Sequence, residues 1–387
     1  MLICPRSCYH RGIIYKEETF GRCSDYASQG SYCVPYYQCH NGTVITGGTN
    51  PVKIEVNRGT IQGLLSPKDS KCPGFLNVCC KGADVDFYPR TRTTVNVASK
   101  CGRRHKYGLG VEIQGFNNSE SQFGEWPHTC AILKEEKTSQ AFRDSQQCGG
   151  SLIAPGVILT AAQCVDKFQE NPTELTIRCG EWDTKHQTEP RPHQDREVQA
   201  LKIHPEFDSK SLHNDWAVLF TSQNFDLQDH IDTICLPHPK DIFVGESCFA
   251  TGWGKDQYGE ADKYEVVLKE FELHIVPQEQ CEAVLKQTRL DRYDSFICAG
   301  GEGDYGNRTC KGDIGSPLVC PSKSDPRRFV QAGLISWGTY HPCGMYPSVA
   351  EAVCWIDDVV TKQLGKESGC FRSYFGLEFD DCLITWS

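Results

Sequence analysis

The sequence predicts a mostly β protein in which a small disulfide-stabilised module precedes a larger unit of short β-strands. Two observations carry this prediction. The chain has 23 cysteines among 387 residues, far more than a reducing compartment usually tolerates as free thiols. Short apolar runs broken by Gly, Pro and Asn fill residues 108–365, which is typical of a β-sandwich or β-barrel. At 39% hydrophobic residues, the chain can also bury at least one large core.

Residues 21–82 are predicted to form the small module, after an N-terminal extension at 1–20. The module contains six cysteines and ends in the adjacent pair Cys79 and Cys80, which cannot easily bond to each other and must reach in two directions. A unit of this size needs such cross-links because its core is small. The segments GSYCVPYYQC and GFLNVCC are expected to be short strands.

Residues 83–107 are predicted to be a basic linker. From residue 81 to residue 107, seven Lys or Arg side chains accompany two acidic ones. An exposed basic linker is a good substrate for a trypsin-like protease, so the candidate cleavage sites are Arg90, Arg92, Arg103 and Arg104.

Residues 108–365 are expected to form the larger unit. Its strand candidates include SLIAPGVILTAA, DWAVLF, CFATGWG and FVQAGLISWG, and a helix is expected late, at VCWIDDVVTKQL. A tail at 366–387 follows, with Cys370 and Cys382.

Composition excludes several classes of protein. A formal charge of −10 argues against general nucleic-acid binding, and no run approaches the roughly 18 apolar residues of a membrane span. The first residues, MLICPRSCYH, lack the apolar core of a signal peptide, so we expect the signal to be absent from this chain. The cysteines do not follow zinc-finger spacing, which leaves disulfides and an extracellular location. Asn41, Asn117 and Asn307 are glycosylation candidates.

Five ordered motifs in the larger unit resemble those of the chymotrypsin-like serine proteases. They are CGGSLIAPGVILTAAQC, HNDWAVL, CFATGWG, CKGDIGSPLVC and LISWG. The resemblance implies a chymotrypsin-like double β-barrel with a C-terminal helix. It also implies that the three triad positions are Gln163, Asp215 and Ile314.

These positions predict an inactive site. A triad needs a hydroxyl that loses its proton to an imidazole, whereas the Gln163 amide does not titrate near neutrality and Ile314 has no nucleophile. Ser316 lies beyond the turn that presents the nucleophile, so we do not expect it to substitute. The backbone N–H groups of Gly312 and Ile314 could still form an oxyanion hole.

The specificity pocket is also expected to be lost. The position at the base of the pocket is Arg308, and the segment from Cys343 to Trp355 is shorter than the usual pocket wall. Asp313 remains, although GLGVEIQGFNNSESQFGEWP offers no obvious N-terminal ammonium to pair with it.

The N-terminal module resembles a clip domain, by its six cysteines, the Cys79–Cys80 pair and CVPYYQC. A clip domain before an inactive protease-like domain is the organisation of arthropod clip-domain serine protease homologues, such as the prophenoloxidase-activating and masquerade-like proteins. The resemblance implies the disulfides Cys23–Cys79, Cys33–Cys72, Cys39–Cys80, Cys101–Cys235, Cys148–Cys164, Cys248–Cys320, Cys281–Cys298 and Cys310–Cys343.

Seven cysteines remain after that assignment. Cys130 and Cys179 lie on segments that look like neighbouring strands, so we expect them to bond. We also expect Cys354 to bond Cys370 or Cys382, while Cys4 and Cys8 are unassigned. An odd total requires at least one thiol that is free or bonds between chains.

A surface loop at GEWDTKHQTEPRPHQDRE carries a metal candidate. Glu181, Asp183, Glu189 and Asp195 could gather around Ca²⁺, which prefers oxygen ligands, and proteases of this fold often bind calcium in the matching loop. The alternative is that these acids are merely solvated. His186 and His193 are expected to be surface residues.

The resemblance implies a protein that is secreted into the haemolymph and assists a protease cascade there. It implies no required small-molecule cofactor. Its partners would be an activating clip-domain protease and prophenoloxidase, with self-association after cleavage possible. An active endopeptidase and a microbe-binding adhesion protein are the alternatives. The clip module has more large apolar residues than it can bury, so we expect a partner groove formed by Val34, Tyr36, Tyr37, Leu64, Leu65 and Phe75, unless they pack against the protease-like domain.

Overall fold

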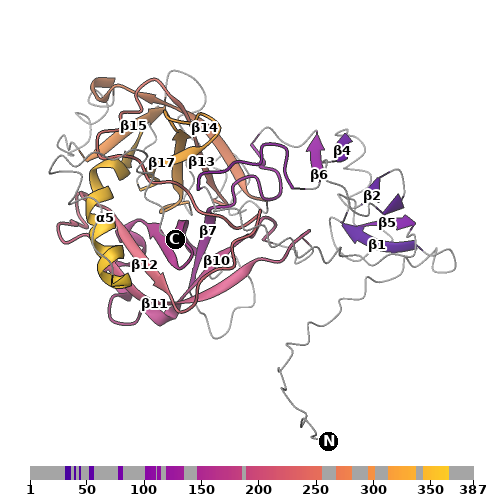
Figure 1. The fold of residues 1–387 in the computed structure, drawn as a ribbon, viewed down its shortest axis with the longest axis horizontal. Coiled ribbons are helices and arrows are strands. Elements are labelled where there is room, and N and C mark those ends of the chain that lie inside the picture. Colours follow the sequence, from indigo (N-terminus) through magenta and orange to yellow (C-terminus); the bar gives the residue numbers. More distant parts are fainter. Residues whose placement is uncertain are drawn as a thin grey trace, which may run out of the picture. The chain divides into compact units, whose positions relative to one another are not determined.

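The computed structural model falls into two units, residues 1–47 with 57–89 and residues 48–56 with 90–387. The residues that it describes are 31–35, 39–40, 43–44, 52–55, 77–81, 101–109, 111–114, 119–134, 146–184, 189–254, 267–280, 295–300, 313–336 and 343–365. Figure 1 shows the strands and helices of both units.

The first unit contains a four-stranded sheet in the order β1-β5-β3-β2. The strands are β1 (Ser31–Pro35), β2 (Cys39–His40), β3 (Thr43–Val44) and β5 (Asn77–Lys81). β1 pairs antiparallel with β5, which places Cys33 opposite Cys79. β1 and β5 lie at the two segments in which the sequence predicts strands, whereas β3 lies in neither segment.

Most predictions for this module lie outside the described residues. They concern Cys23, Cys72, Tyr36, Tyr37, Leu64, Leu65, Phe75 and Asn41, together with the side chains of Cys33, Val34, Cys39, Cys79 and Cys80.

A parallel strand pair lies outside the sheet of the first unit. β4 (Val52–Glu55) pairs with β6 (Val111–Gln114) and clusters with the second unit, although its residues lie within the predicted module at 21–82. Backbone hydrogen bonds between segments so far apart in the sequence leave no mark in cysteine spacing or composition, so this pairing could not be foreseen.

The second unit contains a closed β-barrel in the order β10-β11-β12-β9-β8-β7. Its strands are β7 (Thr129–Lys134), β8 (Gln146–Ala154), β9 (Val157–Thr160), β10 (Leu175–Cys179), β11 (Gln194–Ile203) and β12 (Ala217–Thr221). Ile132, Leu152, Ile158, Ile177 and Leu219 fill it and are almost completely buried.

A six-stranded antiparallel sheet forms the second half of this unit, in the order β17-β16-β13-β14-β15-β18 (Figure 1). The strands are β13 (Ser247–Gly252), β14 (Lys269–Val276), β15 (Phe296–Gly300), β16 (Pro317–Pro321), β17 (Phe329–Leu334) and β18 (Cys343–Pro347). Its core includes Leu273, Leu318, Val330, Ala332 and Tyr346. The predicted double-barrel architecture is confirmed.

The predicted late helix is α5 (Val349–Leu364). Val349, Val353, Ile356 and Val360 recur at helical spacing and are buried, and the helix contacts β17. Gly365 ends it in the left-handed region, at φ 67°, and its N–H returns to the Lys362 carbonyl. The remaining described helices are short: α3 (Ala162–Val165), and the 3₁₀ turns η3 (Asp166–Phe168) and η4 (Pro172–Glu174).

Disulfides cross-link the second unit. Cys101–Cys235, Cys130–Cys179, Cys148–Cys164 and Cys248–Cys320 are all present. Cys298 is disulfide-bonded, but the side chain of its expected partner, Cys281, is not described. The side chains of six further cysteines also lie outside the description: Cys4, Cys8, Cys310, Cys343, Cys370 and Cys382. Cys354 is a free thiol on α5, so its expected bond to the tail is wrong; the odd cysteine count already required one such thiol.

Among the described residues, no helix combines the length and apolarity that a membrane span needs.

Candidate functional site

The position predicted for the proton acceptor is occupied by an amide held in place by neighbours. Gln163 lies on α3, directly after β9, and its Nε2 donates to Asp215 Oδ2 at 2.6 Å and to the carbonyl and Oγ of Ser336, both at 3.0 Å. The Gln163 backbone N–H donates to Asp215 Oδ1 at 2.8 Å. Only the NH₂ end of the amide can face a carboxylate, so this network fixes the side-chain orientation.

Asp215 precedes β12 and lies at the centre of this network, completely buried. The chain reaches it through Asn214, whose φ of 53° is unusual for a residue other than glycine. Burial raises the pKa of the Asp215 carboxyl, and the hydrogen bonds from Ser336 and Gln163 oppose that rise by stabilising the charged form. The carboxylate is thus balanced by neutral donors.

Ser336 is a member of the site that the sequence analysis missed. Its hydroxyl donates to Asp215 Oδ2 at 2.5 Å and accepts from Gln163. The serine belongs to the LISWG motif, which marks the fold but gives no sign that its hydroxyl would complete a polar cluster 121 residues away from Asp215.

Ile314 stands at the predicted nucleophile position, on a turn that requires glycine next to it. Gly315 has φ 87°, and a Cβ there would lie 2.2 Å from Thr160 Oγ1 and 2.5 Å from the Gly149 carbonyl oxygen. The Ile314 carbonyl accepts the Gly149 N–H at 2.8 Å, so the turn is fixed to the first barrel. The Ile314 side chain packs against that barrel's core.

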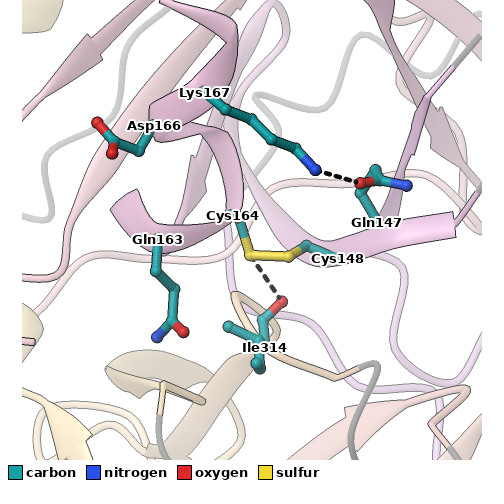
Figure 2. A pocket seen from close by; sticks show the side chains of 7 residues that line it. All are labelled: Gln147, Cys148, Gln163, Cys164, Asp166, Lys167 and Ile314. Atoms are coloured by element: carbon teal, nitrogen blue, oxygen red, sulfur yellow. Dashed lines mark hydrogen bonds between the residues drawn. A yellow bond between two sulfur atoms is a disulfide. The ribbon is translucent and has the colours of Figure 1, made fainter. Parts of the chain in front are cut away.

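A pocket of about 300 Å³ opens beside this turn (Figure 2). It is lined by Gln147, Cys148, Gln163, Cys164, Asp166, Lys167 and Ile314. The disulfide Cys148–Cys164 forms one wall, with the Cys164 sulfur 3.4 Å from the Ile314 carbonyl oxygen. This lining offers no hydroxyl or thiolate as an attacking group.

The neighbouring Ser316 and Asp313 are both buried and engaged. Ser316 is 1% exposed and its hydroxyl packs against Gly149, where a Cβ would lie 1.8 Å from Oγ. Asp313, for which no partner was foreseen, accepts the Gly254 N–H at 2.7 Å. Gly312, Arg308, Asn117 and Asn307 lie outside the described residues.

The described end of the linker is anchored to the protease-like unit. Cys101 bonds Cys235, and the Arg104 guanidinium lies over the adjoining rings of Trp126 and Phe249, 4.3 and 4.2 Å from their centroids. Arg104 also binds Glu125 at 2.8 Å and Glu270 at 3.0 Å. Its side chain is 13% exposed, so the folded chain does not present it to a protease.

Other basic residues of the linker differ from Arg104. Arg103 has a 38% exposed side chain with a distant carboxylate partner, Asp232, at 3.9 Å, and Lys106 is exposed in a turn. Arg90 and Arg92 lie outside the described residues.

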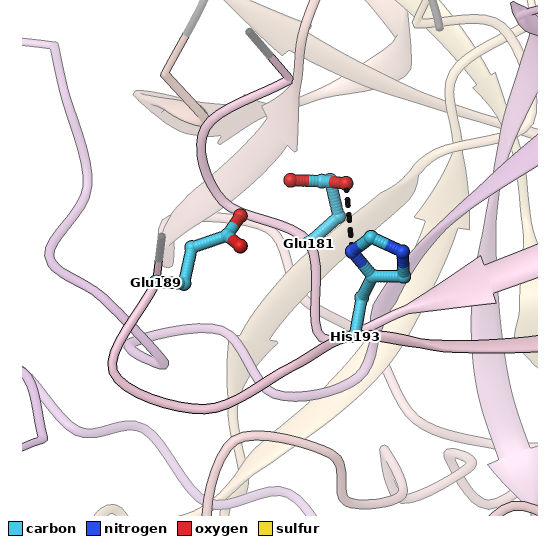
Figure 3. Close-up of side chains that lie close together, drawn as sticks. All are labelled: Glu181, Glu189 and His193. Atoms are coloured by element: carbon cyan, nitrogen blue, oxygen red, sulfur yellow. Dashed lines mark ion pairs between the residues drawn. The ribbon is translucent and has the colours of Figure 1, made fainter. Parts of the chain in front are cut away.

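The predicted metal loop brings together a different set of residues from the expected one. Glu181, Glu189 and His193 have ligand atoms within 4.8 Å of one another (Figure 3). Asp195 instead forms two 2.8 Å hydrogen bonds with Arg178, and Asp183 is buried outside the group. The side chains of Glu181 and His193 are 2% and 18% exposed. Glu181, Asp183 and Glu189 are thus buried and not solvated, whereas Asp195 remains exposed as the alternative expected. His193, which was expected at the surface, is partly buried, and His186 is not described.

Burial perturbs all three groups of this cluster. It raises the pKa of Glu181 and, together with the neighbouring Glu181 carboxyl, raises the pKa of Glu189 to about 9. Burial lowers the pKa of His193, and the nearby Arg178 guanidinium acts in the same direction. Burial thus disfavours the charged form of each of the three groups.

Comparison with known proteins agrees with this architecture. Residues 116–360 match the trypsin family, and residues 22–81 match the serine protease clip domain PPAF-2 family. The chain belongs to the clip-domain serine protease homologues. It is similar to phenoloxidase-activating factor 2 of Galleria mellonella, with 40% identity over 67% of this chain and 88% of that protein.

Two mosquito homologues cover most of the chain. Inactive CLIP domain-containing serine proteases A28 and A8 of Anopheles gambiae are each 32% identical, over 88% and 86% of this chain and 91% and 89% of their own lengths. The names of both relatives describe them as inactive, which agrees with a site that lacks a nucleophile.

Proposed function

We propose that this homologue is a secreted, non-catalytic cofactor of a proteolytic immune cascade, acting in prophenoloxidase activation and melanisation. The observation that carries the proposal is the Gln163–Asp215–Ser336 cluster beside Ile314. Gln163 has an amide at the position of the catalytic imidazole of a serine protease, and Ile314 has a hydrocarbon side chain at the position of the nucleophile. The relative named phenoloxidase-activating factor 2 supports the choice of cascade.

The cluster cannot perform covalent hydrolysis. Gln163 donates its amide protons to Asp215 and Ser336 and cannot accept a proton near neutrality. Loss of the nucleophile or its base costs on the order of 10⁶ in kcat. Ser316 gives no route around this loss, because its hydroxyl is buried against Gly149.

Several features support an extracellular role. The described disulfides form and persist in oxidising compartments, and a chain of charge −10 is unsuited to general nucleic-acid binding. The proposed partners are an activating clip-domain protease and prophenoloxidase, with Tyr36 and Tyr37 of the clip module contributing to the contact.

Cleavage in the linker is the proposed switch. Between residues 101 and 109, Arg103 and Lys106 are accessible, whereas the Arg104 side chain is 13% exposed and lies over two aromatic rings. A cut after either accessible residue leaves the clip module attached, because Cys101 stays bonded to Cys235. The cleaved form could then present new ends for self-association or for a partner.

A reconstituted cascade tests the proposal. The whole chain, freed of proteases, is added to purified prophenoloxidase and an activating clip-domain protease, and phenoloxidase activity is measured. We expect the chain to raise this activity while showing no amidolysis and no organophosphonate labelling by itself. Turnover by the chain alone would overturn the non-catalytic assignment, and cosedimentation with washed microbes without cascade dependence would favour the adhesion alternative.

Variants locate the switch. Arg103→Gln with Lys106→Gln should abolish cleavage between residues 101 and 109 and reduce the cofactor effect, as gels with and without reductant would show. Arg327→Gln is the matched control, because this arginine is 90% exposed but lies outside the linker. An undiminished cofactor effect in the double variant would exclude these bonds as the switch.

A further inference from the structure

A loop before β13 exposes two large aliphatic side chains, Ile242 and Val244, which we call the aliphatic pair. Their residues are 66% and 52% exposed. Phe243, which lies between them, is only 3% exposed and packs in the core of the six-stranded sheet. Among the described residues, the other exposed large apolar side chains are Tyr107 and Leu364. The loop therefore anchors one residue in the core and presents its two neighbours to solvent.

Hydrogen bonds hold this loop in one shape on both sides of Phe243. On one side, Asp241 Oδ2 accepts the His238 N–H at 2.8 Å. On the other side, the Gly245 N–H donates to the carbonyl of Ile275 on β14 at 2.8 Å. A fixed backbone lowers the conformational entropy that binding must remove. The aliphatic pair is therefore preorganised for contact with a partner.

The loop lies near the point where the linker joins the protease-like unit. Phe243 belongs to the same core cluster as Cys101 and Cys235, whose disulfide anchors the linker. The exposed Lys106 is five residues after Cys101, so it lies at most about 18 Å from that anchor. A typical protein interface covers about 800 Å² on each partner, which is a disc roughly 30 Å across. A protease that binds the linker can therefore also cover the aliphatic pair.

The basic residues of the linker do not by themselves direct a trypsin-like protease to it. Arg327 is 90% exposed outside the linker, whereas Arg103 is 38% exposed within it. A protease that cuts the linker and spares such positions needs contacts beyond the cleaved bond. The aliphatic pair has the polar neighbours His238 and Asp241, and this composition resembles the apolar centre and polar rim of a protein interface.

We propose that Ile242 and Val244 form a docking surface for the activating clip-domain protease and hold that protease over the linker. The inference rests on the cleavage switch proposed above. The protease contacts the chain at two places: the basic side chain of the linker enters its specificity pocket, and the aliphatic pair packs against an apolar patch outside that pocket.

Processing kinetics test this docking surface. The whole chain and its Ile242→Ser/Val244→Ser variant are cut by the activating clip-domain protease and, in parallel, by trypsin, and kcat/KM for the linker cut is measured on gels. We expect the variant to lower kcat/KM for the activating protease at least about 10-fold, whereas trypsin cuts both chains equally. Leu364→Ser is the matched control, because it removes an exposed aliphatic side chain at the end of α5. An unchanged rate with the activating protease, or an equal fall with both proteases, would overturn the proposal.

A binding assay separates the docking surface from the cleavage switch. The activating protease is inactivated by replacing its nucleophilic serine with alanine, and the chain carries Arg103→Gln and Lys106→Gln. We expect binding to weaken at least about 10-fold when Ile242→Ser and Val244→Ser are added. Such a difference supports the docking surface even if the active protease leaves the wild-type linker intact, which would refute the switch alone. Equal binding refutes the docking surface and leaves the switch in place.

Two other occupants of this surface predict different results. If the aliphatic pair contacts prophenoloxidase, the Ile242→Ser/Val244→Ser variant is cut at the wild-type rate but loses the cofactor effect. If the pair contacts a second copy of the chain, the variant is again cut normally, but analytical ultracentrifugation shows that its cleaved form no longer self-associates. Either result contradicts the assignment of this surface to the activating protease.

Discussion

Two pairs of glutamates in the protease-like unit differ in what offsets their charge. The buried Glu125 and the 22% exposed Glu270 share the guanidinium of Arg104, at 2.8 and 3.0 Å, and the Trp126 Nε1 donates to Glu270 at 2.7 Å. In the second pair, the Trp182 backbone N–H donates to both Glu181 and Glu189, and Arg178 binds Glu181 as well as Asp195. The first pair shares a cation of the chain, whereas in the second pair burial and the Glu181 carboxyl raise the pKa of Glu189 to about 9, so that Glu189 keeps its proton at neutral pH.

The linker supplies the cation that the first glutamate pair shares. The cation of the first pair comes from Arg104, two residues before the exposed Lys106 and three after the Cys101 disulfide. The linker is thus part of the structure of the protease-like unit, not only a tether. A protease that cuts after Arg103 frees the chain end next to Arg104 but leaves its stacked side chain in place.

Removing the Arg104 guanidinium should have the largest effect on the free energy of unfolding. Arg104→Ala leaves the buried Glu125 and the partly exposed Glu270 without a counter-charge and removes the contact with Trp126 and Phe249, so we expect a loss of about 3–5 kcal/mol in the free energy of unfolding. Urea unfolding followed by tryptophan fluorescence measures it. Arg327→Ala, at an exposed ion pair, is the control and should change stability by less than about 1 kcal/mol.

One result of the Arg104→Ala measurement would contradict this prediction. If the variant loses no more free energy than the Arg327 control, the first glutamate pair does not depend on the guanidinium, and the contrast between the two pairs is unfounded.

The carboxylate of Asp215 differs from both glutamate pairs, because neutral hydrogen-bond donors balance it. Asp215→Ala leaves the Gln163 amide and the Ser336 hydroxyl without their shared acceptor, so we expect a loss of about 2–4 kcal/mol on urea unfolding. Asp226→Ala is the control, since that side chain is 83% exposed. Equal stability of the two variants would show that the degenerate triad contributes nothing to the fold.

The pH dependence of the first pair should be the smallest of these effects. Burial and the Glu270 charge raise the pKa of Glu125 from 4.5 to about 7, against the opposing effect of Arg104. The folded state then binds this proton more tightly than the unfolded state does. The contribution to stability is fully present below pH 4.5 and is lost as the pH rises through 7.

The measurement compares the wild-type chain with Glu125→Gln across that range. The other groups that face Glu125 are Arg104 and Glu270, with the buried His128 behind Trp126, and they are the same in both proteins. We expect the wild type to lose about 1–3 kcal/mol relative to the variant as the pH rises from 4.5 to 7. Parallel curves would mean that Glu125 titrates as in the unfolded chain.

The sequence was sufficient for the architecture and for the loss of catalysis. Ordered motifs located Gln163, Asp215 and Ile314, and the chemistry of an amide and a hydrocarbon follows from residue type alone. The disulfides Cys130–Cys179 and Cys101–Cys235 were also expected, and the structure contains both. These inferences succeed because each depends on local pattern or covalent chemistry.

Only the tertiary structure could decide which charges meet. Arg103 and Arg104 are adjacent and chemically identical, yet one is exposed and the other lies over two aromatic rings, Trp126 and Phe249, that are far apart in the sequence. Likewise, of the four acids in one loop, Glu181 and Glu189 gather with His193, Asp183 is buried apart from them, and Asp195 binds Arg178. Burial and pairing set the energy of a charge, and both depend on segments far apart in the chain, so residue type and spacing alone could not determine them.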